Sequence, residues 1–285
     1  MSDAYAACLE IASRHYENFP VASLLVPASL RPHLAAVYAF ARGADDIADE
    51  PGRSDEERLS LLAEWQAQLH EPPRSAVFVA LADTRQKFDL PVELFEDLLS
   101  AFRQDVATTR YETWAEVMDY CRRSANPVGR LVLRIAGHRR DEVDRWSDAV
   151  CTALQLTNFW QDLAIDWQRG RLYLPGELWR TAGADTADLD RRMLSAPWRS
   201  ALQQASSVTQ TLFAEGRPVC DSVNGRLRYE LRATLLGGLR ILDKLERGHF
   251  DVFQQRPTLN ASDAMVIAWR ALARWHATPP STTRS

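Results

Sequence analysis

The spacing of apolar residues is the sequence feature that most constrains the fold. Apolar residues recur along the chain at intervals of three and four, which is the period of one face of an α-helix. No run of β-branched residues alternates with the period of two that a half-buried strand requires. The sequence therefore predicts an all-α protein.

Local signals indicate where helices begin and end. Ser54 with Glu57, and Thr113 with Glu116, have the spacing of a capping box at a helix N-terminus. Gly137 is predicted to end a helix, and Gly170 likewise. Together with the periodicity, these signals predict helices over about 29–49, 92–104, 143–168, 201–215, 227–247 and 262–276.

The predicted helices follow one another without a Gly/Ser linker, a low-complexity block or a solenoid repeat. We therefore expect one helical domain over residues 1–277. Residues 278–285 (TPPSTTRS) have the composition of a disordered tail.

Composition excludes some functions and locations. The 34 Lys and Arg residues against 38 Asp and Glu give a net charge of -4, so no basic field is available to hold nucleic acid. The four cysteines are far apart and predict buried thiols in a reducing compartment. Neither a signal peptide nor an apolar run of ~18 residues is evident. We expect a cytoplasmic protein that at most lies against a membrane surface.

An acidic segment, 45–49 (DDIAD), follows an apolar stretch at the end of a predicted helix. Aspartate is unfavourable there because the helix dipole places partial negative charge at the C-terminus. Asp45 and Asp49 are four residues apart, so their carboxylates share one face and repel. A divalent cation would turn this repulsion into ligation. The alternative is a solvated acidic end, partly neutralised by Arg42.

A second segment repeats this spacing. Asp162 and Asp166 are four apart, and Asn158 and Gln155 precede them on the same face of an otherwise apolar helix. If the two helices face each other, the carboxylates form two sides of one site with oxygen ligands only. Such ligands suit Mg²⁺, which is usually bound by one or two carboxylates together with substrate phosphate oxygens. The pattern therefore predicts a diphosphate substrate.

Several motifs in a fixed order make the chain resemble the trans-isoprenyl diphosphate synthases of the squalene and phytoene synthase type. The resemblance extends from about His15 to Pro257. The motifs are 41–49 (ARGADDIAD), 110–111 (RY), 120–121 (YC) leading to 128–129 (VG), 155–166 (QLTNFWQDLAID) and 170–175 (GRLYLP). It implies a single isoprenoid-synthase bundle of helices around a central cavity.

Four further segments are similar to one branch of that family, the bacterial hydroxysqualene synthases of the hopanoid pathway. They are 17–23 (ENFPVAS), 124–129 (SANPVG), 237–242 (GGLRIL) and 251–257 (DVFQQRP). The resemblance implies that presqualene diphosphate and water are converted into hydroxysqualene and diphosphate. Gln161, Arg122 and Gly238 depart from the carotenoid-type members, which usually carry a basic residue at the first position and tyrosines at the other two.

The resemblance also implies roles for individual residues. The Mg²⁺ ligands would be Asp45, Asp49, Asn158, Asp162 and Asp166, with Arg42 as a further catalytic residue. The substrate would contact His15, Asn18, Tyr38, Gln155, Arg110 and Tyr120. The apolar wall would draw on Phe19, Phe40, Leu131, Leu154, Phe159 and Trp160.

Two other functions remain open on the sequence. One is a head-to-head synthase that condenses two prenyl diphosphates to squalene or phytoene. The other is a non-catalytic helical assembly factor that keeps the fold alone. For the enzymes, the expected partners are a prenyl diphosphate, other enzymes of the same pathway and, because substrate and product are long hydrocarbons, loose contact with a membrane surface.

Overall fold

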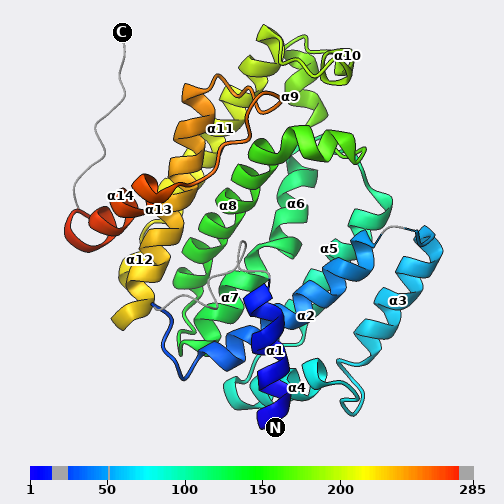
Figure 1. Cartoon of the computed structure of the whole chain (residues 1–285), viewed down its shortest axis with the longest axis vertical. Coiled ribbons are helices and arrows are strands. Elements are labelled where there is room, and N and C mark those ends of the chain that lie inside the picture. Colours follow the sequence, from blue (N-terminus) through cyan, green and yellow to red (C-terminus); the bar gives the residue numbers. More distant parts are fainter. Residues whose placement is uncertain (15–24, 51, 276–285) are drawn as a thin grey trace.

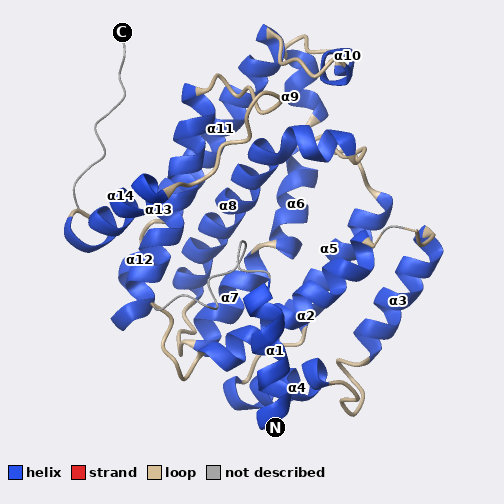
Figure 2. Ribbon diagram, viewed as in Figure 1, coloured by secondary structure: helices blue, strands red, loops and turns tan. Residues whose placement is uncertain are grey.

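The all-α prediction is confirmed by the computed structural model, which describes residues 1–14, 25–50 and 52–275. Within these ranges every regular element is a helix and no strand is present (Figure 2). A single isolated parallel bridge joins Arg110 to Leu172. Across the same ranges, no helix combines the length and apolar character needed to cross a membrane.

The helices of the described ranges are, in chain order, α1 (Ser2–Arg14), α2 (Arg31–Asp49), α3 (Asp55–Ala67), α4 (Ala76–Phe88), α5 (Glu93–Ala107), α6 (Trp114–Ser124), α7 (Asn126–Ile135), α8 (Asp141–Gln168), α9 (Gly176–Thr181), α10 (Thr186–Asp190), α11 (Ala196–Gly216), α12 (Val219–Ser222), α13 (Gly225–Arg247) and α14 (Ala261–Ala273).

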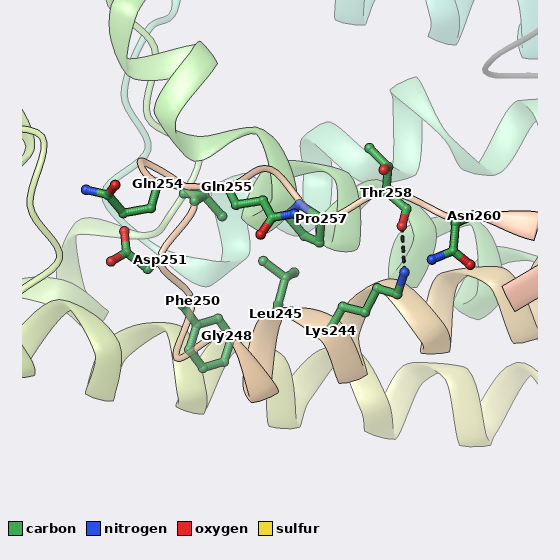
Figure 3. A pocket seen from close by; sticks show the side chains of 11 residues that line it. Lys244, Leu245, Gly248, Phe250, Asp251, Gln254, Gln255, Pro257, Thr258 and Asn260 are labelled. Atoms are coloured by element: carbon green, nitrogen blue, oxygen red, sulfur yellow. Dashed lines mark hydrogen bonds between the residues drawn. The ribbon is translucent and has the colours of Figure 1, made fainter. Parts of the chain in front are cut away.

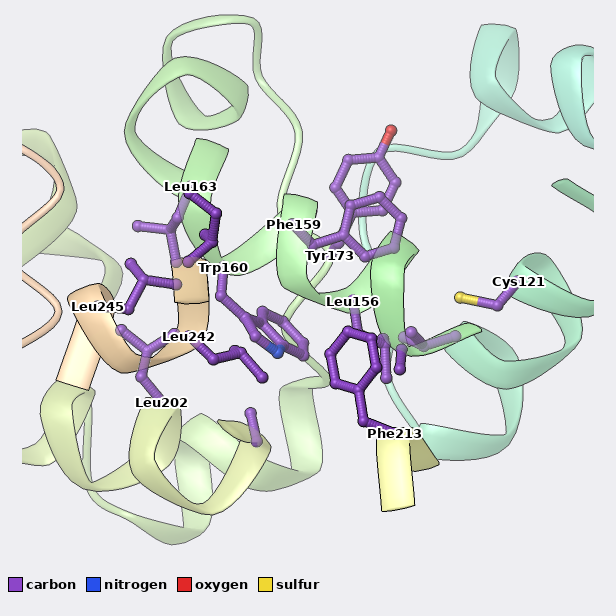
Figure 4. Close-up of a cluster of buried hydrophobic side chains, with 14 of the residues drawn as sticks. Cys121, Leu156, Phe159, Trp160, Leu163, Tyr173, Leu202, Phe213, Leu242 and Leu245 are labelled. Atoms are coloured by element: carbon purple, nitrogen blue, oxygen red, sulfur yellow. The ribbon is translucent and has the colours of Figure 1, made fainter. Parts of the chain in front are cut away.

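Two hydrophobic clusters divide the molecule. The first lies among α1 to α5, where Phe40 packs edge-on against Phe78 and Phe95 at ring distances of 5.8 and 5.3 Å. The second surrounds α8, α11 and α13, with Trp160 and Phe213 among its fully buried members (Figure 4). In Figure 1, α8 runs through the middle of the molecule, with α2, α3 and α5 on one side and α11 and α13 on the other.

A short helix, α7, contributes to both clusters. Leu131 and Ile135 are buried in the first cluster, and Leu133 is buried in the second. The acidic segments therefore lie on helices with different surroundings, since α2 belongs to the first cluster and α8 to the second.

The predicted boundary signals are confirmed. Both capping boxes form, at Ser54–Glu57 and at Thr113–Glu116. Gly137 and Gly170 adopt φ angles of 85° and 79°, in the region that favours glycine.

Other parts of the helix prediction were incomplete. α11 begins at Ala196, five residues earlier than predicted, because a proline is tolerated in its first turn. α1, α4 and the short helices α9, α10 and α12 were not predicted at all. The predicted tail, 278–285, lies outside the described residues.

Close packing between α11 and α8 depends on Gly216. A Cβ atom at this position would lie 2.6 Å from the carbonyl oxygen of Trp146 and 2.8 Å from the backbone nitrogen of Val150. Both are backbone atoms of α8, so they cannot move aside as a side chain would. At Gly237, by contrast, the nearest atom is Leu259 Cδ1 at 3.5 Å.

We therefore predict opposite effects for two glycine substitutions. Gly216→Ala should lower the free energy of unfolding by about 1–3 kcal/mol, because the helices must move apart. Gly237→Ala should leave it unchanged or raise it by up to about 1 kcal/mol, because alanine favours the helix. Urea unfolding followed by circular dichroism measures both, and equal effects would contradict the packing argument.

Candidate active site

The two acidic segments converge on one arginine. Asp45 and Asp49 lie in the last turns of α2, and Asp162 and Asp166 lie in the last turns of α8. Arg171, just after α8, donates from Nη2 to Asp49 Oδ1 at 2.8 Å. Its backbone nitrogen donates to the Asp166 carbonyl oxygen at 2.7 Å. Arg171 therefore ties the end of α8 to Asp49 at the end of α2.

Their carboxylates also influence one another electrostatically. Burial, followed by the charge of Asp162, raises the pKa of Asp166 to about 7, and Asp49 on the opposite helix adds to the shift. Burial and the charge of Asp49 raise the pKa of Asp45. Burial and neighbouring like charge therefore both disfavour ionisation of Asp45 and Asp166.

Arg42 compensates part of this charge. Its guanidinium lies 3.2 Å from Asp45 and 2.5 Å from Asp46. These are the ion pairs expected if the segment were a solvated acidic helix end neutralised by Arg42. Asp45 nevertheless keeps a raised pKa, so this neutralisation is incomplete.

On α8, Asp162 is held from two sides. Asn158 Nδ2 donates to Asp162 Oδ2 at 2.9 Å. Arg256 donates to both carboxylate oxygens, with Nη2 3.2 Å from Oδ2. The next residue, Pro257, accepts a hydrogen bond from Gln161 Nε2 at 2.6 Å. Arg256 belongs to a segment that carries part of the branch resemblance, but no role was predicted for it, because its partner lies 94 residues earlier in the chain.

A third helix contributes a carboxylate that the sequence did not reveal. Asp105 on α5 accepts a hydrogen bond from Tyr120 at 2.8 Å, and its other oxygen, Oδ1, is buried with no hydrogen-bond partner. Burial raises the pKa of Asp105 to about 7, with smaller contributions from Asp49 and Asp45. A single aspartate on an amphipathic helix gives no signal that distinguishes it from a surface residue.

Aromatic rings surround Tyr120. Phe159 and Tyr173 stack in parallel with ring centres 3.8 Å apart (Figure 4), and Tyr120 lies 6.0 and 5.8 Å from them. Of the predicted apolar wall, Phe159 thus lies beside the Asp105–Tyr120 pair. Phe40 belongs to the first hydrophobic cluster, and Trp160 is buried with its indole N–H on Thr209.

Two other predicted wall residues lie in the hydrophobic clusters. Leu131 is fully buried in the first cluster, and Leu154 packs at the edge of the second. Phe19 lies outside the described residues.

Two of the predicted substrate residues lie on the same helices as the acidic segments. Tyr38 and Gln155 lie on α2 and α8, seven residues before Asp45 and Asp162. Burial raises the pKa of Tyr38, which is within electrostatic reach of Arg42 and Asp45.

Arg110 is engaged elsewhere. It donates to the carbonyl oxygens of Thr109 and Gly170 and lies 4.7 Å over the Trp167 ring, so its observed contacts fix the loop after α8. The predicted substrate residues His15 and Asn18 lie outside the described residues.

A cavity of about 480 Å³ adjoins the Asp162 side of the site. It lies between the end of α13 and the loop that leads to α14, and Pro257 is among its lining residues (Figure 3). None of the acidic residues of α2 or α8 lines it.

The donor chemistry of the site fits a hydrated Mg²⁺ ion. In the described part of the chain, no three Asp, Glu, His or Cys side chains are close enough to hold a metal by themselves. Mg²⁺ does not require such a cage, since it keeps several waters and shares its coordination with substrate phosphates. The unpartnered oxygen of Asp105 and the raised pKa values of Asp45 and Asp166 mark negative charge that a cation would balance.

Comparison with known proteins adds independent evidence. A family model described as squalene/phytoene synthase matches residues 12–263. The hydroxysqualene synthase of Zymomonas mobilis is 40% identical over 214 residues, 73% of this chain and 71% of that protein. The hydroxysqualene synthase of Rhodopseudomonas palustris is 34% identical over 264 residues, 90% of this chain and 88% of that protein.

A solved structure supports the same assignment. The squalene synthase HpnC from Alicyclobacillus acidocaldarius superimposes with a TM-score of 0.82 at 39% identity, over 87% of this chain and 95% of that one. With the matched family model and the converging acidic segments, this similarity leads to one conclusion: the chain belongs to the squalene/phytoene synthase family.

Proposed function

We propose that this protein is a Mg²⁺-dependent hydroxysqualene synthase, which converts presqualene diphosphate and water into hydroxysqualene and diphosphate. The family acts on prenyl diphosphates. The observation that carries the proposal is that Arg171 binds the Asp49 carboxylate of α2 and lies within electrostatic reach of the Asp166 carboxylate of α8, beside an aromatic interior. The names of the relatives at 40% and 34% identity favour this reaction within the family.

The residues proposed to hold the metal are Asp45, Asp49, Asn158, Asp162 and Asp166. Bound Mg²⁺ would supply a Lewis acid that stabilises the departing diphosphate. Arg42, Arg171 and Arg256 place three guanidinium groups beside these carboxylates. Arginine binds phosphate oxygens through paired N–H groups, so these side chains would orient the diphosphate.

The aromatic group beside Asp105 suits the cation left by diphosphate departure. The faces of Phe159 and Tyr173 attract positive charge, and an apolar wall keeps bulk water away from it. The product also requires one water at the end of the reaction. Tyr120 and Asp105 are the polar pair within this wall, and the unpartnered Asp105 Oδ1 would accept a hydrogen bond from that water.

The strongest alternative is a head-to-head synthase that makes squalene or phytoene, because the matched family includes both. Gly238 is one departure from the carotenoid-type members, which commonly carry tyrosine there. A Cβ atom at Gly238 would lie 2.5 Å from Phe213 Cζ and 2.8 Å from Leu154 Cδ2, so a tyrosine would require both side chains to move.

The substrate test separates these functions directly. The protein is incubated with presqualene diphosphate or farnesyl diphosphate, each in ¹⁸O-labelled water, and the products are analysed by mass spectrometry. We expect labelled hydroxysqualene from presqualene diphosphate and no product from farnesyl diphosphate. Turnover of farnesyl diphosphate alone would favour the head-to-head synthase, and no turnover of either would favour the assembly factor.

Removal of one carboxylate from either helix should impair turnover of presqualene diphosphate. We expect Asp45→Asn and Asp162→Asn each to lower kcat by about a hundredfold or more, because a metal contributes several kcal/mol to such a barrier. Both should also raise the Mg²⁺ concentration needed for half-maximal rate. Chelation should abolish the activity and added Mg²⁺ restore it. Asp89→Asn is the control, because that carboxylate is 95% exposed at the end of α4 and pairs with Arg139, outside the site.

Asp105 should make stability depend on pH. Because its folded-state pKa is raised to about 7, the folded chain binds more protons than the unfolded chain between about pH 4 and 7. Its contribution to the unfolding free energy should therefore fall as the pH rises, by at most about 1.4 kcal/mol per pH unit. Asp105→Asn should flatten this dependence in urea unfolding without metal, whereas Asp89→Asn should not. A slope unchanged by Asp105→Asn would contradict the assignment.

A further inference from the structure

The outward face of α14 is apolar. Met265, Val266, Trp269 and Leu272 are 68%, 49%, 53% and 64% exposed. Their positions, i, i+1, i+4 and i+7, place them along one side of the helix. In Figure 1, α14 lies at the edge of the molecule beside α13, away from α2 to α5. We call these four residues the α14 apolar face.

Ion pairs on the inward side fix this orientation. Asp263, in the first turn of α14, is 1% exposed and binds Arg240 at 2.7 Å and also Lys244. Ala271 and Trp275 are buried on the same side. Rotation of α14 to hide its apolar face would expose these groups and break a buried, paired charge.

The residues before α14 connect it to the candidate active site. Arg256 binds Asp162, and Asn260, four residues later, caps α14. Four residues of fully extended chain cover about 14 Å at most. Lys244 Nζ, which binds Asp263, also donates to the Thr258 carbonyl oxygen at 2.8 Å (Figure 3). The start of α14 is therefore held close to the Asp162 side of the site.

Positive charge accompanies the α14 apolar face. α14 and the residue after it carry two arginines against one carboxylate, Asp263, which is already paired on the inward side. Arg270 and Arg274 lie at the end of α14, and the Arg274 guanidinium is 5.1 Å over the Trp269 ring.

We propose that α14 docks on an anionic lipid surface, with its apolar face at the boundary between headgroups and acyl chains. An exposed apolar face with tryptophan and flanking arginines is typical of helices that lie in this boundary. Anionic headgroups complement Arg270 and Arg274 at the end of this face, whereas symmetric pairing of two copies through the face would bring these arginines of the two copies together. On the proposed function, docking would place the site beside the phase that holds its hydrocarbon substrate and product.

The test is co-sedimentation of the full chain with vesicles. One set contains equal amounts of phosphatidylglycerol and phosphatidylcholine, and the other contains phosphatidylcholine alone. We expect binding to the anionic vesicles that weakens with salt and is much weaker for the neutral vesicles. The double variant Trp269→Ser/Leu272→Ser should bind about a hundredfold more weakly, about tenfold for each side chain.

One control variant and two further variants of α14 extend the test. Met193→Ser removes a side chain that is 50% exposed in the loop before α11 and should bind like the unmodified chain. Arg274→Gln should weaken binding to anionic vesicles about fivefold. Because all these side chains are exposed, the thermal unfolding midpoint should be unchanged, and Met265→Ser provides a second, milder test of the same face.

Three results would overturn the proposal: no binding of the unmodified chain, equal binding of the double variant, or a dimer in light scattering that the double variant converts to a monomer. The last result would identify the face as a contact between copies. Turnover of presqualene diphosphate in detergent, measured separately, reports on the proposed function. The double variant should retain it, so a failure of docking and a failure of the proposed function are distinguishable.

Discussion

Mutual repulsion among carboxylates is the constraint on which this structure depends. Asp45 and Asp49 from α2, Asp105 from α5, and Asp162 and Asp166 from α8 are close enough to influence one another electrostatically. Such an arrangement is unfavourable unless cations balance it. Arg42, Arg171 and Arg256 provide part of the balance from three different parts of the chain, and the remaining negative charge is what a divalent ion would take up.

Rigid supports keep the repelling groups together. α2 is fixed in the first hydrophobic cluster by Phe40, whereas α8 is fixed in the second by Trp160 and its hydrogen bond to Thr209. Because each helix is packed against its own cluster, neither can retreat from the other without loss of buried apolar contacts. The energy that holds the site together thus comes from residues that take no part in its chemistry.

The sequence predicted the parts of this arrangement that have a local pattern. Helical periodicity, the capping boxes and the two pairs of aspartates four residues apart are each contained within a short window. Asp105 and Arg256 could not be predicted, because one is a single acid on an ordinary amphipathic helix and the other meets Asp162 only through the fold. α4 was missed because the apolar residues of its first turns, AVFVAL, form a continuous run without a clear period.

The packing of α7 limits where two chains of this fold can be joined into a working chimera. Leu131 and Ile135 on one face of α7 belong to the first cluster, and Leu133 on the opposite face belongs to the second. A single ten-residue helix thus forms part of both interiors. The two halves are therefore not exchangeable modules. A chimera joined within α7 would have to match two unrelated interiors at once, and only the buried Ala125 separates α7 from α6, so a recombination point is favoured in the loop at 136–140 that follows the helix.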